Sequence, residues 1–364
     1  MIGLETKDSR IPYLDGLRAI SILLVLFGHT ITSNSWLESK WYLKIFLANP
    51  LLGVRIFFVL SGFLITTLLL NEQDASGRIS IRGFYVRRIA RIFPAFYLYF
   101  AVIGVLTALH VMQVPSASFY AAGTYTWNLF CLRPGGNGDP TGLFGHMWTL
   151  STEEQFYLIW PSLLVFLGRR WTLRLSLFGV VLFPLIRFGA FFVLSPGLQR
   201  DEILVHTGQD MILWGCLGAF ALRSGLLNRL LARRYRFVNP LVCGLVVFGL
   251  GGLIVAHLLA GFTFYMLPTL ESISTLLLVF WLLSGEGGLL RRFLETWPVV
   301  QLGLISYSLY IWQQPFTSWP EMSWLSFPWN ALLPVAIAIL SYRLVEVPLR
   351  KLIRRWFSQP QPAH

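Results

Sequence analysis

The side chains with the clearest chemical potential lie in the first apolar segment, residues 11–31 (IPYLDGLRAISILLVLFGHTI), which carries Asp15, Arg18 and His29. A charge near the centre of a bilayer costs roughly 3 kcal/mol, so such residues are seldom kept without a role. Arg18 and His29 are eleven residues apart, which is three helical turns plus about 20°, so one helix face would carry both. They would stand roughly 16 Å apart along the axis. Histidine exchanges protons near neutral pH, so we expect His29 to act as a general base. The alternative is an interfacial histidine without a chemical role.

A second candidate group is the arginine cluster in FYVRRIARIFPAFY, which contains Arg87, Arg88 and Arg91. Arg88 and Arg91 are three residues apart, so they would share one face of a helix that enters the membrane. Guanidinium groups bind phosphate through two parallel hydrogen bonds. The spacing therefore favours a phosphorylated cofactor bound from the cytoplasmic side, and the alternative is simple anchoring at the membrane surface.

The third group is a pair of carboxylates, Glu153 and Glu154, in GHMWTLSTEEQFYLIWP (residues 145–161). Ser151 and Glu154 fit the S-x-x-E pattern of a capping box, which predicts a helix that begins near Ser151. Glu153 has no such structural explanation. Both carboxylates would then lie at the level of His29, where a carboxylate orients an imidazole and stabilises its protonated form. The sequence does not choose between the two glutamates.

Other polar residues in apolar segments have simpler interpretations. Ser61–Gly62 favours close helix packing, and Arg343 and Glu346 are spaced to form an ion pair on one helix. We find no phosphate-binding loop, nucleophile elbow or H-E-x-x-H motif, and no metal-ligand spacing among the six histidines. The three cysteines do not suggest a disulfide framework.

The elements that must position these groups are membrane-spanning helices. The chain is 55% hydrophobic and only 13% charged, and its mean hydropathy is +0.63. Soluble domains are usually about 25% charged, so we predict an all-α polytopic membrane protein. Ten spans are expected, at 12–31, 46–70, 93–112, 147–167, 175–195, 209–223, 238–258, 265–284, 299–317 and 329–348.

The distribution of positive charge sets the expected orientation. Of the 29 lysines and arginines, 21 fall in the segments on one side and four in the loops on the other. The positive-inside rule then places both termini in the cytoplasm. Because the basic residues follow this rule, the net charge of +12 does not indicate a nucleic-acid partner. The first segment lacks a cleavage site for a signal peptidase, and we expect residues 1–364 to form a single membrane domain.

Six blocks, in order, resemble the membrane-bound acyltransferase 3 family: YLDGLRAISILLVLFGHT, FFVLSGFLIT, YVRRIARIFPAFY, HMWTLSTEEQFYLIWP, ISYSLYIWQQP and SYRLVEVPL. The resemblance implies an O-acyltransferase of a bacterial inner membrane. It also implies an acyl-CoA donor, usually acetyl-CoA, and a hydroxyl-bearing acceptor such as a surface polysaccharide or lipopolysaccharide. The family's Arg-x10-His motif falls on Arg18 and His29, its Arg-x-x-Arg motif on Arg88 and Arg91, and the glutamate of its E-E-Q-F-Y block on Glu153 or Glu154.

The sequence departs from this family in two places. Gln313 and Gln314 follow Trp312 where a histidine is frequent, and Gly208 stands where a basic residue often precedes Asp210. Neither departure touches the central motifs, and both bear on the type of acceptor. The C-terminal esterase-like domain of many relatives is not expected here.

Together these observations predict a donor site and a base on one helix face. Arg88 and Arg91, with Arg87 and Arg18, would hold the phosphates of acyl-CoA, a substrate rather than a permanently bound cofactor. The pantetheine arm would extend toward His29, and Glu153 or Glu154 would hold the imidazole. Direct transfer and an acyl-histidine intermediate both stay open. The alternative function is a transporter or flippase of a glycan or lipid intermediate, but residues 1–170 and 175–364 share no repeated motif of the kind transporters often carry.

Overall fold

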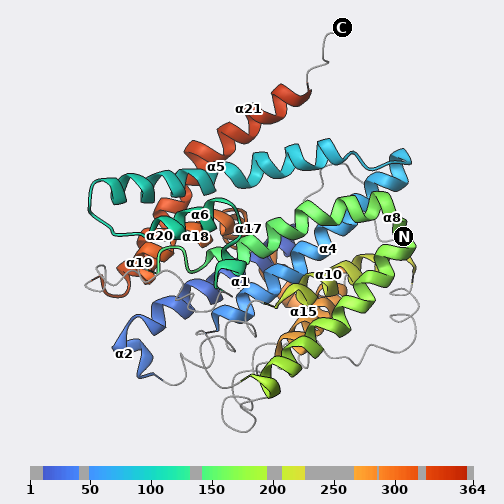
Figure 1. The fold of residues 1–364 in the computed structure, drawn as a ribbon, viewed down its shortest axis with the longest axis horizontal. Helices are drawn as coiled ribbons and strands as arrows, with labels where there is room; N and C mark the ends of the chain where they lie inside the picture. The colour runs from blue at the N-terminus through green and yellow to red at the C-terminus, as the bar shows by residue number, and fades with distance from the viewer. Residues whose placement is uncertain are drawn as a thin grey trace.

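The computed structural model describes residues 11–40, 49–131, 142–194, 207–225, 266–284, 287–318 and 325–358. Over these ranges the chain is helical and contains no strand, as the composition predicts (Figure 1). In chain order the elements are α1 (Pro12–Thr32), α2 (Ser35–Glu38), α4 (Pro50–Ser76), α5 (Ile81–Ala108), α6 (Ser116–Gly123), α7 (Trp127–Cys131), α8 (Met147–Val193), α10 (Gln209–Arg223), α15 (Leu267–Leu283), α16 (Gly288–Leu294), α17 (Trp297–Leu304), α18 (Ser306–Trp312), α19 (Gln314–Thr317), α20 (Trp329–Ser341), the π-helix η4 (Tyr342–Glu346) and α21 (Val347–Ser358).

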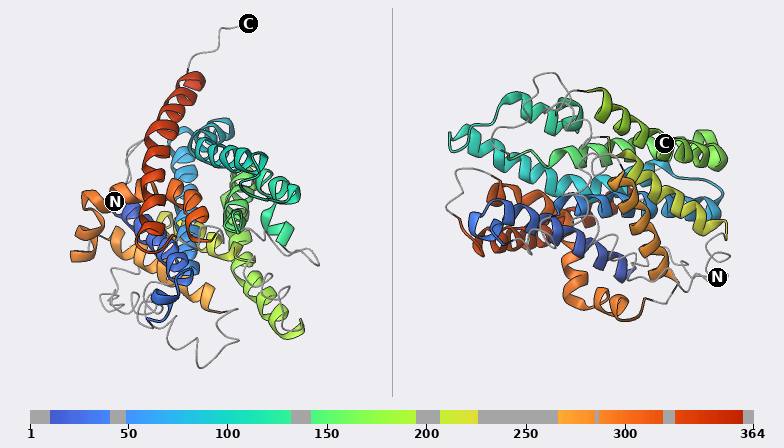
Figure 2. Two further views of the ribbon diagram at one scale, coloured as in Figure 1. Left: turned by 90° about the vertical axis from the view of Figure 1, so that its left-hand side faces the viewer. Right: turned by 90° about the horizontal axis from the view of Figure 1, so that it is seen from below.

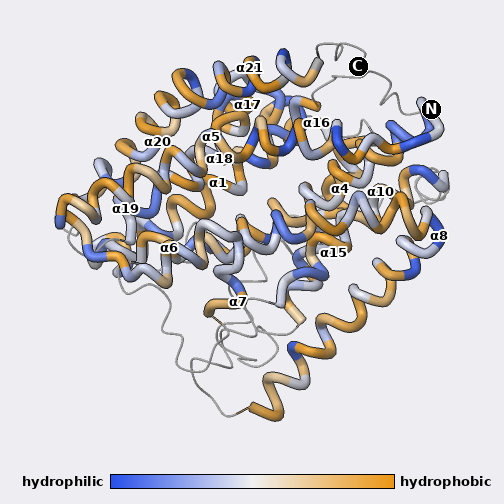
Figure 3. The backbone as a smooth tube through the Cα atoms, turned by 45° about the horizontal axis from the view of Figure 1, so that its top comes forward, coloured by the Kyte–Doolittle hydropathy of each residue, from blue (hydrophilic) through white to orange (hydrophobic). Residues whose placement is uncertain are grey.

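Five helices of the described part are long and apolar enough to cross a membrane: α1, α4, α5, α8 and the run from α20 into α21. A sixth span results if the bent pair α15 and α16 is counted as one. Large apolar side chains on the second half of α8, such as Phe178 and Phe192, are more than half exposed, and Figure 3 shows mostly apolar residues there. Such a surface suits lipid. The count of ten stays a prediction, and the span expected at 238–258 lies outside the described residues.

The helix α8 is two arms joined at a bend. Gly168 has φ 72° and ψ 172°, a backbone conformation that glycine adopts without steric cost. The Thr172 hydroxyl donates to the Leu163 carbonyl at 3.2 Å, although nine residues of straight helix would separate them by roughly 13 Å. Figure 1 shows the second arm folding back from the first. The two arms correspond to the spans expected at 147–167 and 175–195.

One expected span is not continuous. The segment expected at 299–317 is divided into α17, α18 and α19, with breaks at Ile305 and Gln313. In membrane proteins such breaks are tolerated where the backbone is buried in protein or lines a cavity. At the C-terminal end of the described part, α21 projects from the bundle, as the left view of Figure 2 shows.

The centre of the bundle is formed by α1, α4 and α10. In the most apolar stretches of α1 and α4, 72% and 67% of the residues are buried, against 22% in α8. The pair α4 and α10 packs backbone to backbone. A methyl group added at Gly62 would lie 1.9 Å from the Ile212 carbonyl oxygen, and one added at Gly215 would lie 2.1 Å from the Val59 carbonyl oxygen. The packing role predicted for Gly62 is therefore present.

Ion pairs join the positively charged ends of several helices. Asp74, near the end of α4, pairs with Arg169 at the bend of α8 and with Arg223 at the end of α10. Glu72 pairs with Arg87 at 2.9 Å. Segments that the charge bias assigns to one side thus meet at one end of the bundle, and the cytoplasmic side of that end stays a prediction.

Candidate active site

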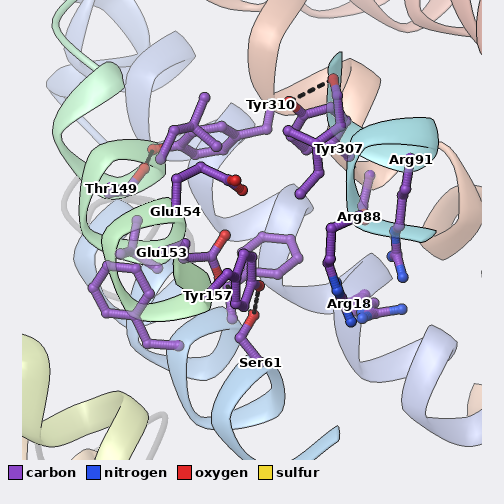
Figure 4. A pocket seen from close by; sticks show the side chains of 16 residues that line it. Arg18, Ser61, Arg88, Arg91, Thr149, Glu153, Glu154, Tyr157, Tyr307 and Tyr310 are labelled. Carbon is purple, nitrogen blue, oxygen red and sulfur yellow. Dashed lines mark hydrogen bonds between the residues drawn. The ribbon is translucent and has the colours of Figure 1, made fainter. Parts of the chain in front are cut away.

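A cavity between α1, α4, α5, α8 and α18 collects most of the predicted site residues. It is lined by Arg18 from α1, by Arg88 and Arg91 from α5, and by Glu153 and Glu154 from α8. Figure 4 shows the three guanidinium groups converging on one side of the cavity, with the glutamates on the other. The helical spacing of Arg88 and Arg91 therefore does place both side chains at one surface, as the sequence predicts.

Hydrogen bonds fix the acidic side of this cavity. The Ser61 hydroxyl donates to a carboxylate oxygen of Glu153 at 2.5 Å, and the Tyr157 hydroxyl donates to Ser61 at 3.0 Å. The guanidinium of Arg88 lies over the Tyr157 ring, 4.9 Å from its centroid, where the ring face attracts a cation. Ser61 thus has a polar role that packing alone did not predict.

A second cavity continues the first toward the N-terminal end of α1. The two cavities share Arg18, Arg91 and Tyr307, and the second adds Arg350 and Glu346 among its lining residues. The two cavities are therefore adjacent, and Arg350 lines the second one. Arg350 is not among the predicted site residues, because in the sequence it is one of several basic residues that follow the last expected span.

Arg87 is not part of either cavity. Its guanidinium pairs with Glu72, and its side chain is 39% exposed. A helix turns by 100° per residue, so neighbouring positions point in different directions. The structure therefore separates Arg87 from Arg88 and Arg91.

The predicted contact between His29 and a glutamate is not formed. The helix α8 begins at Met147, where the span expected at 147–167 also begins, rather than near Ser151. Glu153 therefore lies about one turn, or roughly 6 Å, farther from the helix start than the capping box predicts. The capping box is also wrong, because Ser151 is inside the helix and its hydroxyl accepts from the Trp127 backbone N–H at 3.1 Å. Nδ1 of His29, at the other end of α1 from Arg18, is buried and has no hydrogen-bond partner.

Two uncharged side chains lie beside His29 instead. They are His146, just before α8, and Gln313, at the break between α18 and α19. Gln313 is therefore a neighbour of His29, although its position is outside the central motifs of the sequence. Burial, and to a smaller degree the neighbouring His29, lowers the pKa of His146 to about 3, so its imidazole is neutral.

One face of α8, together with His146 just before the helix, extends from one end of the site to the other. His146, Thr149, Glu153 and Tyr157 follow at intervals of three and four residues, so they share one face. His146 neighbours His29, whereas Glu153 and Tyr157 line the cavity with Arg18. The face of α8 therefore runs antiparallel to the face of α1 that carries Arg18 and His29.

Buried ion pairs outside the cavity have structural roles. Arg187 binds both carboxylate oxygens of Asp210, at 2.6 and 2.8 Å, so Asp210 has a basic partner even though Gly208 is not basic. Arg55 pairs with Glu271. Within the described ranges no cluster of three or more His, Cys, Asp or Glu residues could hold a metal ion.

One predicted pair is absent. Glu346 accepts a hydrogen bond from Ser308, and no ion pair joins it to Arg343, which is exposed. Both residues lie in the π-helix η4. Its wider turn changes the angle between positions three apart, so the spacing that predicts a pair on an α-helix does not apply.

An apolar helical bundle that buries arginines, glutamates and histidines along one line has the features of a membrane-embedded active site. The chain belongs to the acyltransferase 3 family, whose model, described as "Acyltransferase domain", matches residues 11–343. This confirms the family predicted from the six sequence blocks.

Two relatives illustrate the similarity. The chain is 27% identical over 395 residues to O-acetyltransferase OatA of Staphylococcus aureus (strain NCTC 8325 / PS 47), which covers 96% of this chain and 60% of that protein. It is 29% identical over 379 residues to peptidoglycan O-acetyltransferase OatA of Listeria monocytogenes, covering 95% of this chain and 57% of that protein. The chain thus spans less than two thirds of these relatives. No solved structure matches it.

Proposed function

We propose that this protein is an O-acyltransferase that moves an acyl group, in the first instance acetyl, from acyl-CoA to a hydroxyl of a cell-surface glycan. The observation that carries the proposal is the alignment of the arginine-lined cavity with His29 along one face of α1. Family membership supports acyl transfer. The names of the relatives support an acetyl group and a glycan acceptor. The protein would be integral to a bacterial inner (plasma) membrane.

The donor would enter at the end that carries the positive charge, which we assign to the cytoplasm. Its phosphates would bind Arg18, Arg88, Arg91 and Arg350, which line the two adjacent cavities. Glu153 and Glu154, on the other side of the cavity, would offset part of this positive charge. The pantetheine arm is an extended chain, so it is suited to the roughly 16 Å that separates Arg18 from His29.

In the chemical step, His29 acts as the general base. Its imidazole removes the proton from the acceptor hydroxyl while the hydroxyl oxygen attacks the thioester carbonyl carbon. A C–O bond forms, the C–S bond breaks, and the imidazolium returns the proton to the departing CoA sulfur. The products are an acyl ester and CoA-SH. Holding donor and acceptor together beside His29 would supply much of the acceleration.

The test uses membranes that contain the protein, acetyl-CoA labelled in the acetyl group, and glycan strands of peptidoglycan as acceptor. Label should enter the glycan with wild type and with His110→Asn, a control at an exposed histidine after α5. It should fall to background with His29→Asn, because an amide cannot act as the base. Equal labelling with both variants would remove His29 from the mechanism. Absence of labelling and of acetyl-CoA consumption by wild type would instead favour the transporter.

A further inference from the structure

The region beside His29 contains a set of buried polar atoms without partners. They belong to three side chains: Nδ1 of His29, both ring nitrogens of His146, and both amide atoms of Gln313. His146 is 3% exposed and Gln313 is fully buried. Buried polar atoms are nearly always hydrogen-bonded in folded proteins, and each exception asks for an explanation such as a bound ligand. The Gln313 amide faces the His29 imidazole, and a bond between them would satisfy at most one of these atoms on each side chain, so three or more of the five atoms still need a partner.

The fold holds these side chains in place by other contacts. The carbonyl oxygen of His146 accepts from the hydroxyls of Thr149 and Tyr310, at 2.9 and 3.2 Å. The His146 ring packs edge to face against Tyr99 and Tyr310, with centroids 5.7 and 5.5 Å apart. The backbone N–H of Gln313 donates to the Leu309 carbonyl at 3.1 Å. The His146 ring and the Gln313 backbone are therefore held by other contacts, while the polar atoms of both side chains are left available.

The chemistry of the unpaired atoms defines the ligand that would satisfy them. A neutral imidazole offers one donor and one acceptor, and so does a glutamine amide. None of the three side chains is acidic, and neither Arg nor Lys is among them. This differs from the cavity with three arginines, which suits phosphate. A group that donates and accepts without carrying charge fits here, and the hydroxyls of a sugar are such groups.

We propose that His146 and Gln313, together with His29, form the acceptor site, and that they bind two neighbouring hydroxyl groups of a sugar. One hydroxyl is presented to His29 for acylation. The adjacent hydroxyl is held by His146 and Gln313, which thereby select the position that is acylated. This inference rests on the proposed acyltransferase function and assigns to that function its acceptor residues.

The experiment measures steady-state kinetics of the full chain in lipid nanodiscs, with acetyl-CoA as donor and peptidoglycan glycan strands as acceptor. Gln313→Leu and His146→Ala should each raise the acceptor KM by about tenfold, the size expected for one lost hydrogen bond. The donor KM should stay within twofold of wild type, because these side chains do not line the arginine cavity. His146→Asn, which keeps a donor and an acceptor, should recover part of the acceptor affinity. His110→Asn should match wild type.

The outcomes separate this inference from the function on which it rests. A wild type that transfers no acetyl group overturns the proposed function and the acceptor site with it. An active wild type, with acceptor KM unchanged in both Gln313→Leu and His146→Ala, overturns the acceptor site alone. An equal rise in donor and acceptor KM would indicate that the variants disturb the fold, and it would also overturn the assignment. The position of the new ester, read by NMR, should become mixed in Gln313→Leu.

Discussion

The neighbours Arg87 and Arg88 offer a test of the donor site within one helical turn. Arg88 lines the cavity, whereas Arg87 pairs with Glu72 at the surface. A hydrogen bond to a charged group contributes about 1.5–3 kcal/mol, so Arg88→Ala should raise the KM for acetyl-CoA by roughly 12- to 150-fold. Arg87→Ala removes a half-exposed ion pair, and a pair near the surface contributes about 0–1 kcal/mol of stability. The donor KM should not change.

A truncated donor sharpens this comparison. S-acetylpantetheine carries the same thioester as acetyl-CoA but no phosphate. If Arg88 binds phosphate, wild type and Arg88→Ala should show nearly equal KM for S-acetylpantetheine, measured by release of the free thiol. A large effect of Arg88→Ala on both donors would refute phosphate binding and point to the charge balance with Glu153. An effect of Arg87→Ala as large as that of Arg88→Ala would refute the geometric separation of the two residues.

Three further predictions concern other parts of the structure. Arg350→Ala should raise the donor KM about tenfold and leave kcat unchanged, since Arg350 lines the second cavity; an unchanged KM would remove that cavity from the donor path. Arg187→Met leaves the carboxylate of Asp210 buried without its cation, and should lower stability by about 3–5 kcal/mol in thermal unfolding; adding Asp210→Asn should recover much of the loss. Gly215→Leu should prevent folding because its Cβ meets backbone, whereas Gly189→Leu, in open space, should elute normally in size-exclusion chromatography; folded Gly215→Leu would contradict the packing of α4 and α10.

Local geometry made part of the site predictable. The rotation per residue of an α-helix is fixed, so the sequence alone places Arg18 with His29 on one face and Arg88 with Arg91 on another. The fold brings Arg18, Arg88 and Arg91 to one cavity. The all-helical membrane architecture was equally accessible, because it follows from composition and apolar run length.

The position of each residue along the length of the bundle was harder to predict. The position of Glu153 depends on where α8 begins, and the serine that suggested a start near Ser151 is instead bonded to the backbone of α7. His146 and Gln313 reach His29 only through tertiary packing, from segments far apart in sequence. No spacing rule joins such residues. The unpaired His146 was visible in the sequence only as one of six histidines without a motif.

The backbone contact between α4 and α10 limits how this protein can move. Interlocked carbonyls and glycines leave no room for one helix to slide or rotate against the other. Any conformational change that admits a substrate must therefore occur in elements outside this pair. The first arm of α8 and the interrupted segment α17–α19 face the cavities and contain a bend and two breaks. We expect the cavities to open and close during turnover through movement of the first arm of α8 and of α17–α19. The helices α4 and α10 should keep their positions relative to each other.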